Sequence, residues 1–374
     1  MHYNNQFPQP EDENTLRVFR GFLGLTVLLA MLSLIWIGTK VKFKPRPAMI
    51  TVYAFSALQE VLQDGIEPAF KKYWLETENQ EVDFITTFAG SGWITGHIID
   101  RFPAEIALLS SELDVRILEE KGLVNSSGDS ADPPGEIFCS SPLVIAAHQS
   151  QETGQFTYLD ALKTDNAKLI PDPKSSGLGF WILSTLAALH YQGGPCSEVV
   201  DSLWKELHTS MTNFNTSARE VSKKFLSGQG DLLITYEREA KQYLYAADNT
   251  IQIYYPPITV LCQHYSVTIP QHIRSEQETV VHAFAEYLKS TAAQDIFSAY
   301  GFRDPSGTGI ASPSHFQSVE STGMNPRPKI PGQLRGMKSH THVHPLADSM
   351  ITLDKFCDPK TMAKAIFGKY SDQP

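Results

Sequence analysis

Strand-like and helix-like segments alternate along residues 49–124, and this alternation limits the fold more than any other feature of the sequence. Three short apolar runs, "MITVYAF", "EVDFITTF" and "AEIALLS", are each followed by a segment whose apolar residues have helical spacing. Strands that alternate with helices form a parallel sheet with helices on both faces. The first part of the chain therefore predicts an α/β lobe.

A second lobe is predicted after residue 137. Residues 137–147 read as a long apolar strand that leaves the first lobe, and residues 251–269 read as strands that return to it. Between them, short strands again alternate with helices. We therefore expect an α/β, two-lobed fold with a hinge of two crossing strands.

The predicted organisation along the chain has six parts. They are a disordered tail (1–17), a transmembrane signal-anchor (18–40), a linker (41–48), the first part of lobe 1 (49–138), lobe 2 (139–264), and the second part of lobe 1 (265–374), which carries a loop insertion at about 305–348.

The anchor is predicted from residues Gly21 to Gly38, 18 residues of which only Thr26 and Ser33 are polar. A helix needs about 20 apolar residues to span a bilayer. No clear small-residue cleavage site follows, so we expect an uncleaved, single-pass helix in the inner membrane. The flanking positive charges favour a cytoplasmic C-terminal part. The binding-protein features of the C-terminal part, described below, favour the extracytoplasmic side, and we expect that side.

The net charge of −10 argues against a nucleic-acid partner, because such proteins need a basic face. It also argues against a large cationic funnel for anions. Any bound anion would therefore be held by local dipoles and hydroxyl groups.

Small polar turns stand beside four predicted strand or helix ends, where open α/β sheets bind ligands. Helix N-termini at such turns supply free N–H groups. Lys174 and Arg219 lie beside two of them, where they could add charge or remain solvated. The four turns are Ser56-Ala57, Gly90-Ser91-Gly92, Ser175-Ser176-Gly177 and Thr216-Ser217-Ala218.

Several motifs from residue 50 to the C-terminus, the insertion excepted, resemble one family. The chain is similar there to the periplasmic sulfate- and thiosulfate-binding proteins of ABC importers, which are type 2 solute-binding proteins. The resemblance implies the two-lobed type 2 periplasmic-binding-protein fold, with the ligand held between the lobes. The motifs are "FAGSGWITGHII", "PDPKSSGLGFW", "TSARE", "GQGDLLITYERE" and "ITLDKF".

The resemblance also implies which residues bind the ligand. They are Ser56, Ser91, Ser176, Gly177, Ala218 and Tyr236. Three positions depart from the family: Leu178 replaces a glycine, Ser56 an aspartate and Tyr236 an indole-donating tryptophan. Molybdate-binding relatives also use a tyrosine at the last position, so the ligand is expected to be sulfate, thiosulfate or molybdate.

The expected function is solute binding for import, with ABC permease subunits as partners. A sensor, or a scaffold with a degenerate cleft, remains an alternative. An enzyme is not expected. Serines near His97 or His190 could form a nucleophile–base pair with these histidines, but the sequence has no "GxSxG" turn. A ferric-ion site at Tyr254-Tyr255 is the remaining alternative.

Two further features leave alternatives open. Cys139 and Cys262 begin the two predicted crossing strands and are either a disulfide across the hinge or two buried thiols. His340, His342 and His344 alternate, which would place them on one face of a strand for a metal, or they belong to a solvated loop. We expect no cofactor and no bound metal.

Overall fold

The computed structural model divides the chain into two units, Met1–Arg46 and Pro47–Pro374. The predicted closing helix at 359–367, Cys357, the three alternating histidines, and most of the predicted linker and insertion lie outside the described residues. The structure describes residues 13–40, 46–125, 134–148, 157–163, 168–190, 196–210, 217–246, 251–307 and 350–351.

The first unit contains helix α1, Glu13–Lys40, which begins inside the predicted disordered tail. Its large apolar side chains from Val18 to Leu32 are exposed. Within the described residues, no helix combines the length and the apolar character needed to cross a membrane. The anchor predicted at 18–40 lies within α1 and stays a prediction.

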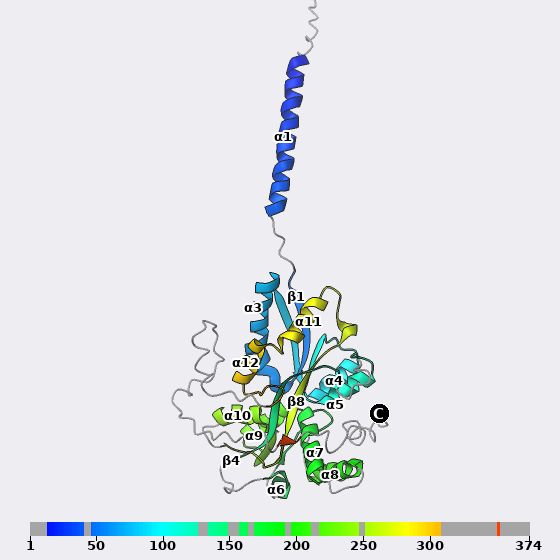
Figure 1. The fold of residues 1–374 in the computed structure, drawn as a ribbon, viewed down its shortest axis with the longest axis vertical. Helices are drawn as coiled ribbons and strands as arrows, with labels where there is room; N and C mark the ends of the chain where they lie inside the picture. The colour runs from blue at the N-terminus through cyan, green and yellow to red at the C-terminus, as the bar shows by residue number, and fades with distance from the viewer. Residues whose placement is uncertain are drawn as a thin grey trace, which may run out of the picture. The chain divides into compact units, whose positions relative to one another are not determined.

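The first half of the second unit is built on the parallel strands that the alternation predicts. β1 (Ala48–Phe55) pairs in parallel with β2 (Val82–Ala89) and with β3 (Ile106–Leu109). In Figure 1, α3 and α12 lie on one side of these strands, and α4 and α5 on the other. The helices of this half are η1 (Ser56–Leu58), α2 (Gln59–Val61), η2 (Leu62–Ile66), α3 (Glu67–Glu78), α4 (Ser91–Ile99), α5 (Glu112–Glu120), η3 (Pro270–His272), α11 (Glu278–Tyr287) and α12 (Thr291–Ala299).

Two long antiparallel strands, β4 (Glu136–His148) and β8 (Thr259–Thr268), connect the two halves, as expected for the hinge. β4 pairs with β8 up to Pro142 and with β6 and β7 from Leu143 onward. The sheet order is β2-β1-β3-β8-β4-β6-β5. The remaining elements are α6 (Tyr158–Lys163), β5 (Lys168–Leu169), α7 (Gly177–His190), α8 (Cys196–Ser210), α9 (Ala218–Leu226), β6 (Leu232–Tyr236), α10 (Glu237–Ala246), β7 (Ile251–Tyr254) and β9 (Met350–Ile351).

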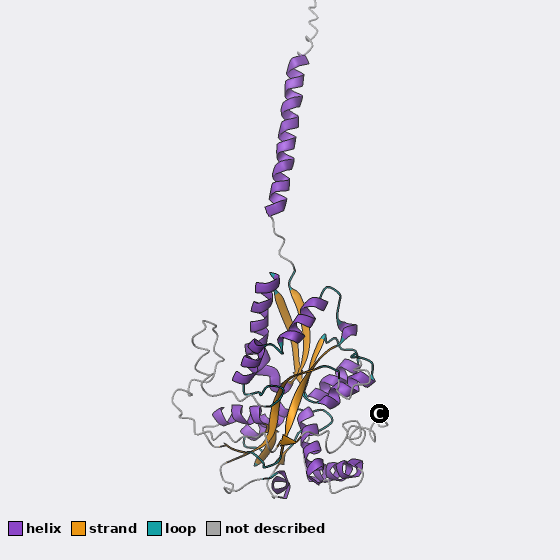
Figure 2. Ribbon diagram, viewed as in Figure 1, coloured by secondary structure: helices purple, strands orange, loops and turns teal. Residues whose placement is uncertain are grey.

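The sheet is mixed rather than parallel throughout. β8 runs antiparallel to both β3 and β4, because the chain passes between the halves once in each direction. Figure 2 shows the strands flanked by helices in both halves. The exact lobe boundaries at residues 138 and 264 stay predictions.

One hydrophobic core runs through both halves of this unit. Its buried residues include Ile50 on β1, Ile145 on β4 and Leu183 on α7. In the first half, Phe70 on α3 packs its ring against Phe284 on α11 at a centroid distance of 5.0 Å. Burying such aromatic rings contributes about 1.5 to 3 kcal/mol each and fixes the helices on the sheet that carries the candidate site.

Cys139 and Cys262 are both buried and free. Cys139 lies opposite His264 in the β4–β8 ladder, whereas Cys262 lies opposite Ser141, so the two cysteines do not face one another. Burial raises the pKa of both thiols well above the usual value. Of the two alternatives left open by the sequence, the structure has the pair of buried thiols.

Candidate functional site

Three parallel strands end at one edge of the sheet and bring the first group of polar turns together. The register places Phe55 at the end of β1 beside Ala89 at the end of β2, and β3 ends next to β1 on its other side. The residues that follow these strands therefore meet. They are Ser56 in η1, Ser91 at the start of α4, and Ser110 after β3.

The second half of the unit supplies the other group of residues. Helix α7 begins at Gly177, directly after Ser176, and α9 begins at Ala218. Strand β6 ends at Tyr236, which is 1% exposed. These positions follow the same rule as the first group, since each lies where a strand ends or a helix begins.

All six residues predicted to bind the ligand line a single cavity. It holds about 160 Å³ of space free of protein atoms, part of which is open to solvent. No charged side chain is found among its described lining residues. The lining consists of Phe55, Ser56, Ala89, Gly90, Ser91, Ser110, Ser176, Gly177, Leu178, Ala218 and Tyr236.

Three helices begin at the cavity wall. The first N–H groups of α4, α7 and α9 belong to Ser91, Gly177 and Ala218, and such groups have no partner within their own helix. The hydroxyl of Ser217, which the sequence also marked, has a capping role: it accepts a hydrogen bond from the N–H of Glu220 at 3.2 Å. Its predicted neighbour Thr216 lies outside the described residues.

Two hydroxyls in the cavity wall are buried without a partner. Ser110 Oγ lies near Tyr236 Oη and acts to lower the pKa of that phenol. The two hydroxyls are not in hydrogen-bond geometry, and neither has a hydrogen-bond partner among the described residues. Burial raises the pKa of Tyr236 well above its usual value, so the phenol keeps its proton. A buried unpaired hydroxyl costs about 1 to 3 kcal/mol, a cost that a ligand would offset.

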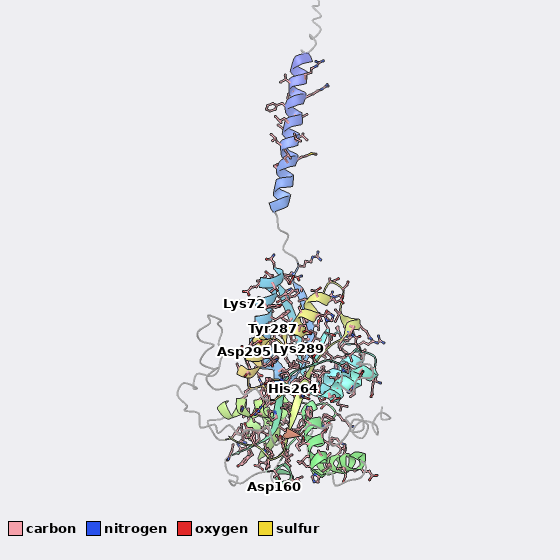
Figure 3. All side chains as sticks on the ribbon, viewed as in Figure 1. Lys72, Asp160, His264, Tyr287, Lys289 and Asp295 are labelled. Carbon is pink, nitrogen blue, oxygen red and sulfur yellow. The ribbon has the colours of Figure 1, made fainter. Side chains whose placement is uncertain are left out.

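Ser110 was not predicted from the sequence, and its backbone is hydrogen-bonded to three other residues around the site. Its N–H donates to Ser91 Oγ at 3.0 Å. Its carbonyl accepts from Trp181 Nε1 at 2.7 Å and lies 3.3 Å from His264 Nδ1. Burial lowers the pKa of His264 to about 3, so this ring is neutral, and its Nδ1 carries the proton directed at the carbonyl. His264 is labelled in Figure 3.

The hydroxyl of Ser91 is already engaged. It donates to Oδ2 of the buried Asp114 at 2.6 Å, and Ser111 Oγ donates to the same oxygen at 2.6 Å. The family resemblance implied that Ser91 binds the ligand. In this structure its hydroxyl proton points at Asp114, which leaves the backbone N–H at the start of α4 as the group that Ser91 can donate.

The two sides of the cavity touch directly. The N–H of Trp93 on α4 donates to the carbonyl of Ser175 at 3.2 Å. A Cβ on Gly92 would lie only 2.1 Å from the carbonyl oxygen of Lys174. A glycine is therefore required at position 92 for this close approach.

Arg219, which the sequence placed beside a turn, belongs to a buried cluster of charges next to the cavity. Its guanidinium pairs with Glu60, and Arg238 Nη2 also binds Glu60, at 3.0 Å. Burial acts to raise the pKa of Glu60, but the two arginines outweigh it and lower that pKa to about 2. The positive charge of Arg219 thus joins α9 to α2 instead of entering the cavity.

The alternative sites receive no support from the geometry. Nδ1 of His97 and of His190 each bonds to a carbonyl one turn earlier on its own helix, and neither histidine lines the cavity. The Tyr255 hydroxyl donates to Glu237 at 3.0 Å. Within the described ranges, no group of three metal-ligating side chains could hold a metal ion.

Comparisons with known proteins show similarity in sequence and in fold. A sulfate-binding protein of Synechococcus elongatus is 25% identical over 289 residues, covering 76% of this chain and 79% of that protein. The solved sulfate-binding protein SubI of Mycobacterium tuberculosis has a TM-score of 0.58 at 23% identity, covering 73% and 90% of the two chains. The molybdate-binding protein of Azotobacter vinelandii has a TM-score of 0.50 at 16% identity, covering 68% and 99%.

These relatives are binding proteins, which supports a non-enzymatic role at the level of the family. The family described as "Bacterial extracellular solute-binding protein" matches residues 50–303, which is more than half of the chain. This chain is therefore a member of the bacterial extracellular solute-binding proteins.

Proposed function

We propose that this protein encloses one tetrahedral oxyanion of the sulfate type between its two halves and presents it for import. The observation that carries the proposal is the uncharged cavity, whose wall holds three helix N-termini and two buried, unpartnered hydroxyls. The sulfate-binding protein of Synechococcus elongatus supports the same ligand class.

The chemistry of the wall suits a small dianion. Each helix N-terminus carries about half a positive charge, so α4, α7 and α9 together offset most of two negative charges. Backbone N–H groups only donate hydrogen bonds, which favours a ligand rich in acceptor oxygens. Four cavity positions are assigned to backbone donors: Ser56, Ser91, Gly177 and Ala218. The N–H of Ser176 already donates to the carbonyl of Asp172 at 2.9 Å, so Ser176 offers its hydroxyl.

The side-chain donors favour two related ligands. Ser176, Ser110 and Tyr236 are the hydroxyls assigned to the ligand. Sulfate is the first expectation from the relatives, and thiosulfate is added by the family that the sequence resembles. Molybdate or tungstate is the second, because Tyr236 stands where the sulfate-binding family has an indole donor, and a phenol reaches the ligand from a different distance.

Location and partners complete the proposal. We assign the Pro47–Pro374 unit to the extracytoplasmic side, ABC permease subunits as its partners, and α1 as its membrane tether. The exposed apolar side chains of α1 between Val18 and Leu32 and the length of the apolar run in the sequence support the tether. Alkaline extraction of membranes tests it: a tethered chain stays in the pellet, whereas an untethered chain is released.

Calorimetry tests the binding function. The full-length chain is titrated with sulfate, thiosulfate, molybdate, tungstate and phosphate. We expect 1:1 binding of one or two of these ions and weaker binding in Ser176→Ala. A folded chain that binds none of them would instead indicate a scaffold with a degenerate cleft.

A further inference from the structure

Asp114 is a buried carboxylate that lies one hydrogen bond behind the cavity. It belongs to α5 and is 4% exposed. Three hydroxyls reach it: Ser91 Oγ and Ser111 Oγ, both 2.6 Å from Oδ2, and Thr95 Oγ1, 3.3 Å from Oδ1. Among the described lining residues, Ser91 is the one member of this group that also faces the cavity.

The hydrogen-bond capacity of Ser91 Oγ decides what it offers to a ligand. A hydroxyl has one proton to donate and two lone pairs to accept with. Its proton goes to Asp114, and one lone pair accepts the N–H of Ser110 at 3.0 Å. Ser91 Oγ therefore retains one lone pair but no proton for a ligand, and a lone pair repels a fully deprotonated oxygen of a ligand and attracts a protonated one.

An ionised Asp114 also opposes a dianion directly. One serine hydroxyl separates the carboxylate from the cavity, so the like charges would act over a short distance in a buried environment. Binding an ion without a proton is therefore coupled to neutralisation of Asp114.

We propose that the site binds its dianion together with one proton, which Asp114 takes up whenever the ligand carries none. The inference rests on the proposed function and adds a positioning residue to it. A proton from solvent bonds to Asp114 Oδ2, which then donates to Ser91 Oγ. The hydroxyl proton of Ser91 turns to a ligand oxygen, and the N–H of Ser110 keeps its bond to Ser91.

A ligand that brings its own proton needs no such change. The O–H of a monohydrogen oxyanion donates to the free lone pair of Ser91 Oγ, and Ser91 continues to donate to Asp114. Sulfate and monohydrogen phosphate are thus distinguished by proton uptake, even where both of them bind.

Other charged and titratable groups lie on the elements packed around Asp114. On its own helix, Arg116 pairs with Glu112 at 3.1 Å. On α4, His97 is bonded to its own helix, and from β8 and β6 the neutral His264 and Tyr236 face this region. Burial raises the pKa of Asp114, while its three hydroxyl partners lower it, and the net direction is upward.

Calorimetry of sulfate binding to the full-length chain tests the proposal. Titrations run from roughly pH 5 to 9 in pairs of buffers with different ionisation enthalpies, which count the protons taken up. Above the ligand-free pKa of Asp114, we expect uptake to approach one proton per sulfate, and the Kd to rise about tenfold per pH unit. With monohydrogen phosphate as the probe, we expect no uptake at Asp114.

Asp114→Asn separates positioning from a merely structural role. Its amide donates permanently to Ser91 Oγ, so sulfate binding is expected to lose its pH dependence and to become tighter than in the wild type at the alkaline end. Ser111→Ala is the matched control, because it removes a hydroxyl from the same oxygen without touching the cavity, and we expect it to retain proton uptake.

The infrared C=O stretch of a protonated carboxyl group gives a second readout, which does not depend on a variant that folds. It is expected to appear when sulfate is added to the wild type at alkaline pH. Sulfate binding without proton uptake and without this band overturns the inference but leaves the proposed function standing. A folded wild type that binds no oxyanion at any pH overturns both.

Discussion

The indole Nε1 of Trp181 on α7 donates a 2.7 Å hydrogen bond to the backbone carbonyl of Ser110 at the end of β3. This bond links the two halves of the Pro47–Pro374 unit beside the cavity that both of them line. The carbonyl belongs to the residue whose side chain carries one of the two unpartnered hydroxyls, so closure of the halves and placement of a ligand donor depend on the same contact.

Trp181→Phe keeps an aromatic ring but removes this donor. A net hydrogen bond contributes about 1 kcal/mol, so we expect the ligand to dissociate several times faster. Stopped-flow measurement of the dissociation rate checks this, with Trp204→Phe on α8 as a control outside the cavity. Equal rates in the two variants would show that the bond does not hold the closed state.

Ser110→Ala and Tyr236→Phe are each expected to weaken ligand binding without lowering the stability of the ligand-free chain. Each removes a hydroxyl that is unpartnered without ligand, so thermal unfolding of the ligand-free chain should stay unchanged or shift upward. Each also removes a hydrogen bond to a charged ligand, which is worth about 1.5 to 3 kcal/mol, so the Kd should rise roughly 10- to 100-fold. A loss of stability with unchanged affinity would assign both hydroxyls to the fold instead.

Gly92→Ala tests the close contact between the halves. The added Cβ would lie 2.1 Å from the Lys174 carbonyl oxygen, so the halves cannot close as they do here and ligand binding should be lost. Gly96→Ala lies on the same helix with open space around its Cβ, and we expect it to bind normally and to gain about 0.5 to 1 kcal/mol of stability. Calorimetry and thermal unfolding of both variants check the pair, and normal binding by Gly92→Ala would contradict the described contact.

The buried cluster around Glu60 predicts a loss of stability in acid. The pKa of Glu60 is lowered from 4.5 to about 2 in the folded chain, so its contribution is fully present above the unfolded value and is lost as the pH falls toward 2. The shift corresponds to about 3 kcal/mol. We therefore expect Glu60→Gln to reduce the free energy of unfolding by about that much at neutral pH.

Urea denaturation at neutral pH and at about pH 3 measures this contribution. Glu76→Gln serves as the control, since Glu76 is an exposed residue whose 3.9 Å contact with Lys72 contributes little. Equal destabilisation by the two substitutions at neutral pH would show that the cluster is not a stabilising one.

Much of the site could be predicted from the sequence because its signals are local. Ser91 and Gly177 each lie at a turn that opens a helix, and a strand, small polar turn and helix in succession are readable within a dozen residues. The parallel order of β1 to β3 then brings these turns to one edge. The two crossing strands followed from the same reasoning.

The rest depends on contacts between distant parts of the chain. Ser110 is a lone serine after a short strand, and its role comes from Trp181, 71 residues away. Arg219 pairs with Glu60, 159 residues away, so its charge could not be assigned from its neighbours in the sequence. The direction of the Ser91 hydroxyl depends on Asp114 behind it, which no turn motif reveals.

The central claim is that amide and hydroxyl dipoles, without a cationic side chain in the cavity wall, hold a small dianion between the two halves. Titration of the full-length chain with sulfate, followed by calorimetry, tests it most directly. The account predicts binding of one ion per chain that weakens in Ser110→Ala and Tyr236→Phe while both variants remain folded. Retention of full sulfate affinity by both folded variants, or no binding of any oxyanion by the folded wild type, would contradict it.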